Sequence, residues 1–207
     1  MAQEDVGMRM VSDKWSLIIG LSFESQRQSE DCQTLRVSYM HVLETERLTL
    51  RRLSLDDAAF ILELLNDPSF LRFIGDKGVR NLEDARQYIL KGPIESYQQL
   101  GFGIYLVALK TTEVPIGICG LLKRDALEDV DIGFAFLPEF RSRGYAFESA
   151  AAVKDYARNI IGLKRLLAIT NNDNQASIRV LEKIGLKFEQ MIRLTEDTPE
   201  IRLYISD

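Results

Sequence analysis

The segment around Gly144 is the part of the chain whose residue types and spacing point most directly to chemistry. Between Leu137 and Ala146 it reads Leu-Pro-Glu-Phe-Arg-Ser-Arg-Gly-Tyr-Ala, which is an Arg-x-x-Gly-x-Ala arrangement that starts at Arg141. The first turn of a helix leaves backbone N–H groups without partners at the positive end of its dipole, and a glycine lets an oxygen approach closely. We therefore expect this segment to bind a diphosphate, with Arg143 reaching a further phosphate.

The spacing alone is a weak signal, because a second copy of the pattern occurs at Gln98, Gly101 and Gly103. That copy runs into an apolar strand, so it lacks a helix N-terminus that would hold an anion, and we interpret it as a turn. Neither copy has the Lys-Ser or Lys-Thr pair of a phosphate P-loop or the three glycines of a dinucleotide fingerprint. Without further support, Gly144 has a purely structural alternative, a turn between a strand and a helix.

Alternating strands and helices must position the Gly144 segment. Period-2 apolar runs predict strands over 47–53, 102–109, 115–122, 130–137, 166–170, 186–194 and 200–206. Apolar stripes predict helices over 55–66, 145–161 and 174–183, and a further helix that Asn81 caps. The Asp67-Pro68 step ends the first helix. The resulting order is β-α-α-β-β-β-α-β-α-β-β, which predicts one mixed α/β domain with a central, mostly antiparallel sheet flanked by helices.

The composition excludes several classes of protein. The chain has 207 residues, of which 46% are hydrophobic, and a formal net charge of −5, so nothing draws it globally to nucleic acid or to anionic membranes. A single histidine, His41, excludes a His-rich metal site, and we expect no metal. Cys32 and Cys119 are expected to be free thiols, with Cys119 in the core. No membrane span or secretory signal is apparent, which favours a cytoplasmic protein, either a monomer or a homodimer.

The first forty residues differ from the rest of the chain. Ser, Gln, Glu and Asp dominate 22–33, and no apolar period persists for two helical turns. We therefore divide the chain into an N-terminal extension, 1–42, which need not be well ordered, and a domain, 43–207.

Four segments in matching order resemble the GNAT superfamily of N-acetyltransferases, and most closely its branch that acetylates the amino termini of ribosomal proteins. They are Glu44-Thr-Glu-Arg-Leu-Thr-Leu-Arg52, Asp131-Ile-Gly-Phe134, Arg141-Ser-Arg-Gly-Tyr-Ala-Phe-Glu148 and Asn174-Gln-Ala-Ser-Ile-Arg-Val-Leu-Glu-Lys-Ile-Gly185. The resemblance covers about four fifths of the chain, from Leu43 onward, and leaves the first forty residues unexplained.

The resemblance implies an acetyl-CoA site. Backbone N–H groups of 143–146 would hold the pyrophosphate, and the strand that ends at Leu137 would pair with the pantetheine arm. Asn174 would bind from the opposite wall, with Ser177 beside it. The implied cofactor-binding residues are Phe136, Leu137, Arg141, Ser142, Arg143, Gly144, Tyr145, Ala146, Asn174 and Ser177. A backbone N–H near Phe136 or Leu137 would donate to the developing oxyanion.

The resemblance leaves the catalytic acid unassigned, and two carboxylates are candidates for the base. The tyrosine that the family often places seven residues after the asparagine is here Leu181. Asp131 is the favoured base, acting through water, and Glu148 is the weaker candidate. An α-amine is about a fifth neutral at physiological pH, whereas a lysine is neutral to only about one part in a thousand. So weakly equipped a site suits an α-amine.

Each site residue also has a structural alternative. Asn174 is a good helix N-cap, Ser177 an ordinary first-turn hydroxyl, Glu148 a complement to the helix dipole and Asp131 an exposed strand residue.

The leading function is acetyl transfer to a primary amine, with a protein or peptide N-terminus favoured over a small-molecule amine. The rivals are a catalytically silent acyl-CoA-binding module and an unrelated α/β interaction protein. Residues 70–77 and 195–200 are expected to face the acceptor.

Overall fold

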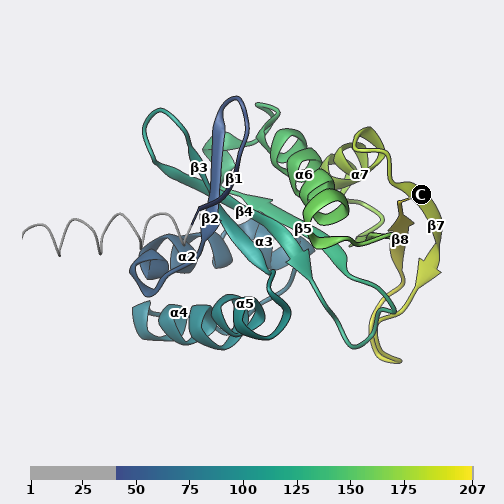
Figure 1. Ribbon diagram of the computed structural model, residues 1–207. Coiled ribbons are helices and arrows are strands. Elements are labelled where there is room, and N and C mark those ends of the chain that lie inside the picture. Colours follow the sequence, from purple (N-terminus) through teal and green to yellow (C-terminus); the bar gives the residue numbers. More distant parts are fainter. Residues whose placement is uncertain (1–40, 207) are drawn as a thin grey trace, which may run out of the picture. The chain divides into compact units, whose positions relative to one another are not determined.

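An eight-stranded sheet forms the centre of residues 41–206, the part of the chain that the computed structural model describes (Figure 1). Its strands are β1 (His41–Glu44), β2 (Leu48–Arg52), β3 (Ile104–Leu109), β4 (Pro115–Leu122), β5 (Asp131–Phe136), β6 (Leu167–Thr170), β7 (Lys187–Ile192) and β8 (Ile201–Ile205). They lie in the order β1-β2-β3-β4-β5-β6-β8-β7, and every neighbouring pair except β5 and β6 is antiparallel. The predicted mixed α/β fold with a mostly antiparallel sheet is confirmed.

Helices cover both faces of the sheet. They are α2 (Ala58–Leu65), α3 (Pro68–Phe73), α4 (Leu82–Ile89), α5 (Glu95–Leu100), α6 (Tyr145–Tyr156) and α7 (Gln175–Lys183), with 3-10 turns at η1 (Leu55–Asp57) and η3 (Pro138–Phe140) and π-helical turns at η2 (Leu90–Ile94) and η4 (Ala157–Ile161). Figure 1 shows α6 and α7 on one side of the sheet and α2, α4 and α5 on the other. The result is a three-layer arrangement with a core on each side of the sheet.

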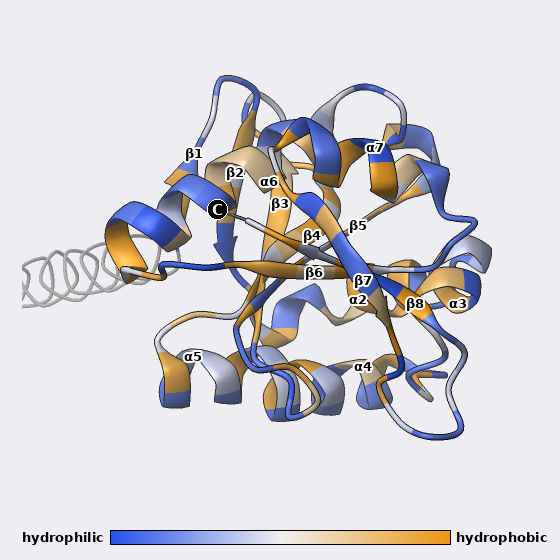
Figure 2. Cartoon of the chain, turned by 90° about the vertical axis from the view of Figure 1, so that its right-hand side faces the viewer, coloured by the Kyte–Doolittle hydropathy of each residue, from blue (hydrophilic) through white to orange (hydrophobic). Residues whose placement is uncertain are grey.

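The two cores follow from strand alternation along β3. Tyr105 and Val107 pack toward α6 and α7, whereas Leu106 and Ala108 pack toward α2 and α4. All four side chains are buried, because successive residues of a strand point to opposite faces and both faces are covered. Figure 2 shows these central strands in hydrophobic colours, while the outer surfaces of the helices are largely hydrophilic.

The structure contains three elements that the sequence did not predict. β1 begins at His41, so two residues assigned to the N-terminal extension belong to the sheet, whereas residues 1–40 of that extension lie outside the described part. The Asp67-Pro68 step ends α2 as expected, but it also starts α3, with Pro68 in the first turn and Asp67 as the N-cap. After α4, the chain continues through the turn around Pro93 into α5.

The two parallel strands, β5 and β6, are hydrogen-bonded at one end only and then diverge. β5 and β6 are paired only at Asp131 and Leu167, where the Leu167 N–H donates to the Val130 carbonyl at 2.9 Å. Beyond that point the two strands separate, although each stays paired with its other neighbour, β4 or β8. The described sheet is therefore split between β5 and β6 from the residue after Asp131 onward. This split lies beside the N-termini of α6 and α7.

Among residues 41–206, no helix is long and apolar enough to cross a membrane.

Candidate active site

The backbone before α6 is shaped to receive an anion. Gly144 is the N-cap and has a φ of +86°, and Ser142 also has a positive φ, +59°. Left-handed residues in such a turn direct successive N–H groups into one concavity, and the first-turn N–H groups of α6 point to the same place. Glycine is needed at 144, because other residues are strained at this φ. The predicted diphosphate segment therefore has the expected local geometry.

A cavity of about 470 Å³ opens at this N-terminus, and we call it the cofactor cavity. Eight of the ten predicted cofactor-binding residues line it, namely Phe136, Arg141, Ser142, Gly144, Tyr145, Ala146, Asn174 and Ser177. Arg179 and Lys183 of α7 add two cations that the sequence did not single out, and no carboxylate is among the lining residues. A cavity with three cationic side chains, a helix N-terminus and aromatic walls fits a molecule with phosphates and an apolar arm.

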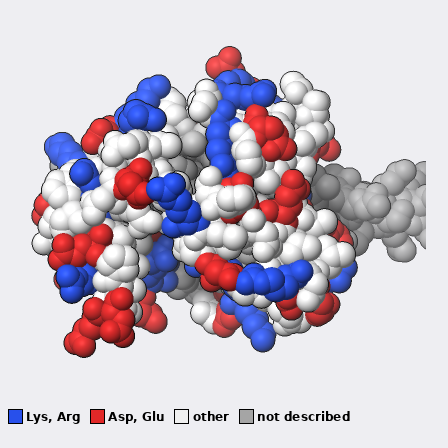
Figure 3. Space-filling view, turned by 180° about the vertical axis from the view of Figure 1, so that it is seen from behind, with Lys and Arg blue, Asp and Glu red and all other residues white. Residues whose placement is uncertain are grey.

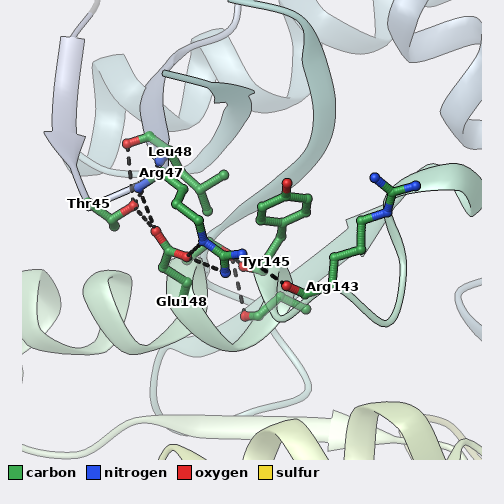
Figure 4. Close-up of polar contacts among 8 residues, drawn as sticks. Thr45, Arg47, Leu48, Arg143, Tyr145 and Glu148 are labelled. Carbon is green, nitrogen blue, oxygen red and sulfur yellow. Dashed lines mark hydrogen bonds and ion pairs between the residues drawn. The ribbon is translucent and has the colours of Figure 1, made fainter. Parts of the chain in front are cut away.

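Two of the ten predicted residues do not line this cavity. Leu137 is buried in the core beneath α2, and its N–H donates to the Ile116 carbonyl of β4 at 3.0 Å, so it is not available to a ligand. Arg143 presents its carbonyl to Arg47 Nη1 at 3.2 Å, and its side chain extends away from that contact (Figure 4). The structure does not support the expectation that Arg143 reaches a further phosphate from this cavity.

Strand alternation identifies the backbone groups that face the split in the sheet. In an antiparallel ladder, the N–H and C=O of one residue point to one neighbour and those of the next residue to the other. Since Leu137 bonds to β4, Phe134 and Phe136 direct their backbone groups toward the β6 side. The Phe136 carbonyl follows this rule, because it accepts a hydrogen bond from Arg141 Nε at 2.8 Å. The N–H of Phe134 was not singled out by the sequence.

All three guanidinium nitrogens of Arg141 donate to other residues of the protein. Besides Phe136, its guanidinium donates to Ser69 Oγ at 2.9 Å and forms an ion pair with Asp67, the N-cap of α3. Burial opposes the charge of Asp67, but hydrogen bonds from Arg141 and from the Phe70 N–H outweigh it, so that its pKa lies below the usual value. Arg141 therefore joins the loop before α6 to α3, and it lines the cofactor cavity in that fixed position.

A second cavity of about 440 Å³ lies against the first, and we call it the acceptor cavity. The two cavities share four lining residues: Phe73, Phe134, Asn174 and Ser177. Both segments expected to face the acceptor contribute to its wall, through Arg72 to Gly75 and through Thr198 and Pro199. The two cavities thus meet at the split in the sheet.

Asn174 and Ser177 stand at this junction. Asn174 Oδ1 accepts a hydrogen bond from the Ser177 N–H at 3.1 Å, so Asn174 is the N-cap of α7. This is the structural role that the sequence predicted as the alternative to cofactor binding. Its side-chain NH2 group and the Ser177 hydroxyl make no hydrogen bond within residues 41–206. Capping and ligand contact are therefore compatible for Asn174.

Asp131 lines the acceptor cavity but is 1% exposed, and so it is not the exposed strand residue of the structural alternative. Both of its oxygens accept from Arg124 Nε, at 3.0 and 3.1 Å. Burial raises the pKa of Asp131 even though Arg124 acts in the opposite direction. Arg124 comes from the loop after β4, and nothing in the sequence pattern linked it to Asp131.

Glu148 does not line either cavity. Its carboxylate accepts hydrogen bonds from Thr45 Oγ1 at 2.6 Å, from the Arg47 N–H at 2.9 Å and from Arg47 Nε at 2.7 Å (Figure 4). Burial opposes its charge, yet these bonds outweigh burial and lower its pKa. Glu148 therefore holds the turn between β1 and β2 against α6, and the geometry favours a structural role over the predicted catalytic one.

Glu148→Gln is expected to destabilise the fold by about 2 kcal/mol at neutral pH and to leave acetyl transfer unchanged, because hydrogen bonds to a charged group are lost outside the cavities. Since folding lowers the pKa of Glu148, its contribution is present above its unfolded pKa, near 4.5, and is lost as the pH falls through the folded value. Urea unfolding of wild type, Glu148→Gln and the exposed-site control Glu182→Gln at about pH 7 and about pH 4 checks this. A folded Glu148→Gln protein with a large loss in kcat would restore a catalytic role.

Neither cysteine nor histidine is among the residues that line the two described cavities. Leu181, at the position of the family's tyrosine, is buried and lines the acceptor cavity. Cys119 lies in the core as predicted, and burial raises the pKa of its thiol to about 12. Within residues 41–206, no group of three or more His, Cys, Asp or Glu is placed to hold a metal ion.

Comparisons with known proteins agree with this geometry. Residues 47–187 match the model of the acetyltransferase (GNAT) domain. The curated relatives include an uncharacterized N-acetyltransferase, YnaD, of Bacillus subtilis, which is 29% identical over 150 residues, 72% of this chain and 84% of that protein.

Solved structures show the same fold. A GNAT-family acetyltransferase from Bacillus anthracis superimposes with a TM-score of 0.67 at 26% identity, over 80% of this chain and 97% of that one. The ribosomal-protein-S5-alanine acetyltransferase from Vibrio fischeri gives a TM-score of 0.65 at 17% identity, over 79% and 94%. The family match covers the whole lining of the cofactor cavity and all of the acceptor cavity except the wall formed by Leu194, Thr198, Pro199 and Ile201. The chain belongs to the GNAT family of acetyltransferases.

Proposed function

We propose that this protein transfers the acetyl group of acetyl-CoA to a primary α-amine, and that the amine is the N-terminus of a protein or peptide. The observation that carries the proposal is the junction of two cavities at the split between β5 and β6. One cavity has the features of a phosphate site, and the other is open to an acceptor. The curated relatives named as N-acetyltransferases support the same reaction.

The residues of the cofactor cavity fit acetyl-CoA. The turn at Gly144 and the first turn of α6 would hold the diphosphate, and Arg179 and Lys183 would add positive charge. The outward carbonyl of Phe134 and the N–H of Phe136 would pair with the amides of the pantetheine arm, as an added strand does. Acetyl-CoA supplies the acetyl group as a thioester.

Acyl transfer needs a hydrogen-bond donor where negative charge develops on the carbonyl oxygen. We assign this role to the N–H of Phe134, because Phe134 lies in the wall that the two cavities share and directs its backbone groups into the split. This replaces the expectation of a donor at Phe136 or Leu137. Phe136 lies farther into the cofactor cavity, and Leu137 is bonded to β4.

Proton transfer requires little from the protein in this scheme. Both oxygens of Asp131 accept hydrogen bonds from Arg124. We therefore propose that Asp131 positions Arg124 and does not act as the general base. An α-amine, with a pKa near 8, is partly neutral at physiological pH and can attack without a strong base, which a lysine cannot. With Leu181 at the expected acid position, the thiol leaves as a thiolate, since its pKa is near 8.5.

Calorimetric titration with acetyl-CoA, followed by mass spectrometry of peptides incubated with protein and acetyl-CoA, tests the proposal. We expect one site per chain, and acetylation at the α-amine with a rate that rises with pH up to about 8, the pKa of that amine. Peptides whose N-terminus is blocked but which contain lysine are the control, and they should not react. Binding without transfer to any amine would favour the silent acyl-CoA-binding module, and absence of binding would overturn the proposal.

The surface charge (Figure 3) and the state of Cys119 guide the proposals for partners and compartment. Figure 3 shows positive and negative side chains interspersed over the face opposite to the view of Figure 1, so this face has no single-sign patch for nucleic acid. The buried, unbridged Cys119 and the absence of a membrane-spanning helix in the described residues are compatible with the cytoplasm, which we propose as the compartment.

A further inference from the structure

Arg124 is held in the wall of the acceptor cavity in an unusual way. Its Nε donates to both oxygens of the buried Asp131, so the ion pair uses only one of the three guanidinium nitrogens. The two terminal nitrogens make no hydrogen bond with any residue of the described part, 41–206. Arg51 and Arg141, in contrast, use their terminal nitrogens for carboxylates of the protein.

The position of Arg124 makes these unused donors available to a ligand. Arg124 lines the acceptor cavity, and its side chain is 35% exposed, whereas that of Asp131 is 1% exposed. A buried carboxylate thus fixes the Nε edge of the guanidinium, and the planar pair of terminal nitrogens, which matches the two oxygens of a carboxylate, keeps its donors unused by the described residues.

The charges around Arg124 favour an anion over a second cation. Asp131 is the sole carboxylate among the residues that line the acceptor cavity, and it is already paired with Arg124. Lys77 lies close enough that repulsion from Arg124 adds to burial in lowering its pKa. Arg72, the other lining cation, is neutralised by Asp173 at 2.6 Å. The acidic Glu196 and Asp197, in the loop after β7, do not line the cavity.

We propose that Arg124 binds a carboxylate of the acceptor, so that the substrate is a primary amine that carries a carboxylate on the same molecule. This inference rests on the proposed acetyl transfer to a primary α-amine and restricts that amine to molecules that carry a carboxylate, whether peptides or free amino acids. The carboxylate has two possible sources, the α-carboxylate of a free amino acid or the acidic side chain of the residue that follows a peptide's N-terminus. A polyamine, which brings further positive charge to Arg124, is disfavoured.

The test compares acceptors that differ only in this charge. Alanine is paired with alaninamide, and a peptide that begins Ala-Asp with one that begins Ala-Asn, and kcat/KM is measured for each with saturating acetyl-CoA. We expect the carboxylate member of at least one pair to exceed its amide by about tenfold or more, which is the magnitude of one charge-assisted bidentate contact. The pair that shows the preference identifies the source of the carboxylate.

Variants connect the preference to Arg124. Arg124→Gln should abolish it while acetyl-CoA binding, measured by calorimetry, stays unchanged. If Arg124→Gln alone fails to fold, the double variant Arg124→Gln with Asp131→Asn replaces it in the same measurements. The double variant leaves no unpaired charge buried at position 131. Arg72→Gln, at the other guanidinium of the same cavity, should keep the preference.

Equal rates for carboxylate and amide acceptors would overturn the inference. A preference that Arg124→Gln retains, or that Arg72→Gln removes, would overturn it as well. Faster acetylation of spermidine than of every carboxylate acceptor would also contradict it. These results differ from failure of the proposed function, in which acetyl-CoA does not bind or no amine of any kind is acetylated.

Discussion

Gly144→Glu is expected to weaken acetyl-CoA binding by about 100-fold or more and to abolish measurable acetyl transfer. The new carboxylate would stand at the turn that we assign to the diphosphate, and two like charges about 4 Å apart repel by roughly 4 kcal/mol near a protein surface. Its Cβ would also lie 3.3 Å from Arg47 Nη2, and the φ of +86° is strained for any residue but glycine. Calorimetry with acetyl-CoA measures the loss directly.

Gly162→Glu is the matched control for this variant. Gly162 follows η4 with a φ of +83°, nothing lies within 4 Å of an added Cβ, and it lines neither cavity. The control therefore has the same left-handed strain and the same charge, and should lose stability by about 1 to 2 kcal/mol without any change in acetyl-CoA affinity. A folded Gly144→Glu protein with full acetyl transfer would show that the turn at Gly144 is not the phosphate site.

The parts of the site that the sequence predicted are those that depend on short segments. The Gly144 turn requires only a strand, a glycine and a helix in succession, and the structure has all three. Asn174 is likewise recognised as a cap from its neighbours alone. The strands from β3 to β5 were also placed nearly residue by residue, because their alternation is regular and the links between them are short.

The parts that the sequence missed depend on contacts between distant segments. Glu148 accepts hydrogen bonds from Thr45 and Arg47, about a hundred residues earlier, and no local sequence pattern predicts that contact. The pairing of Arg124 with Asp131 spans a loop whose path is set by its own packing. Leu137 illustrates a different limit: the strand was predicted correctly, but which of its N–H groups face β4 becomes known only from the register.

Arg141 is the residue whose role the structure changes most, and its replacement is expected to reduce stability more than affinity. In Arg141→Met, the buried carboxylate of Asp67 loses its partner, and the bonds to Ser69 and to the Phe136 carbonyl disappear. Breaking a buried pair costs about 3 to 5 kcal/mol, which we reduce to about 2 to 3 because the Arg141 side chain is 35% exposed. Thermal unfolding should show a Tm lower by roughly 5 to 10 °C.

The pH dependence and a double variant separate this role from direct phosphate binding. Because folding lowers the pKa of Asp67, the pair stabilises the fold above the unfolded pKa and stops doing so as the pH falls through the folded value. The difference between wild type and Arg141→Met should therefore shrink below about pH 4. Adding Asp67→Asn to Arg141→Met should recover part of the lost stability, since asparagine still caps α3 and leaves no buried charge. An unchanged Tm together with a large loss of acetyl-CoA affinity would instead show that Arg141 acts by contacting the cofactor, as the family resemblance implies.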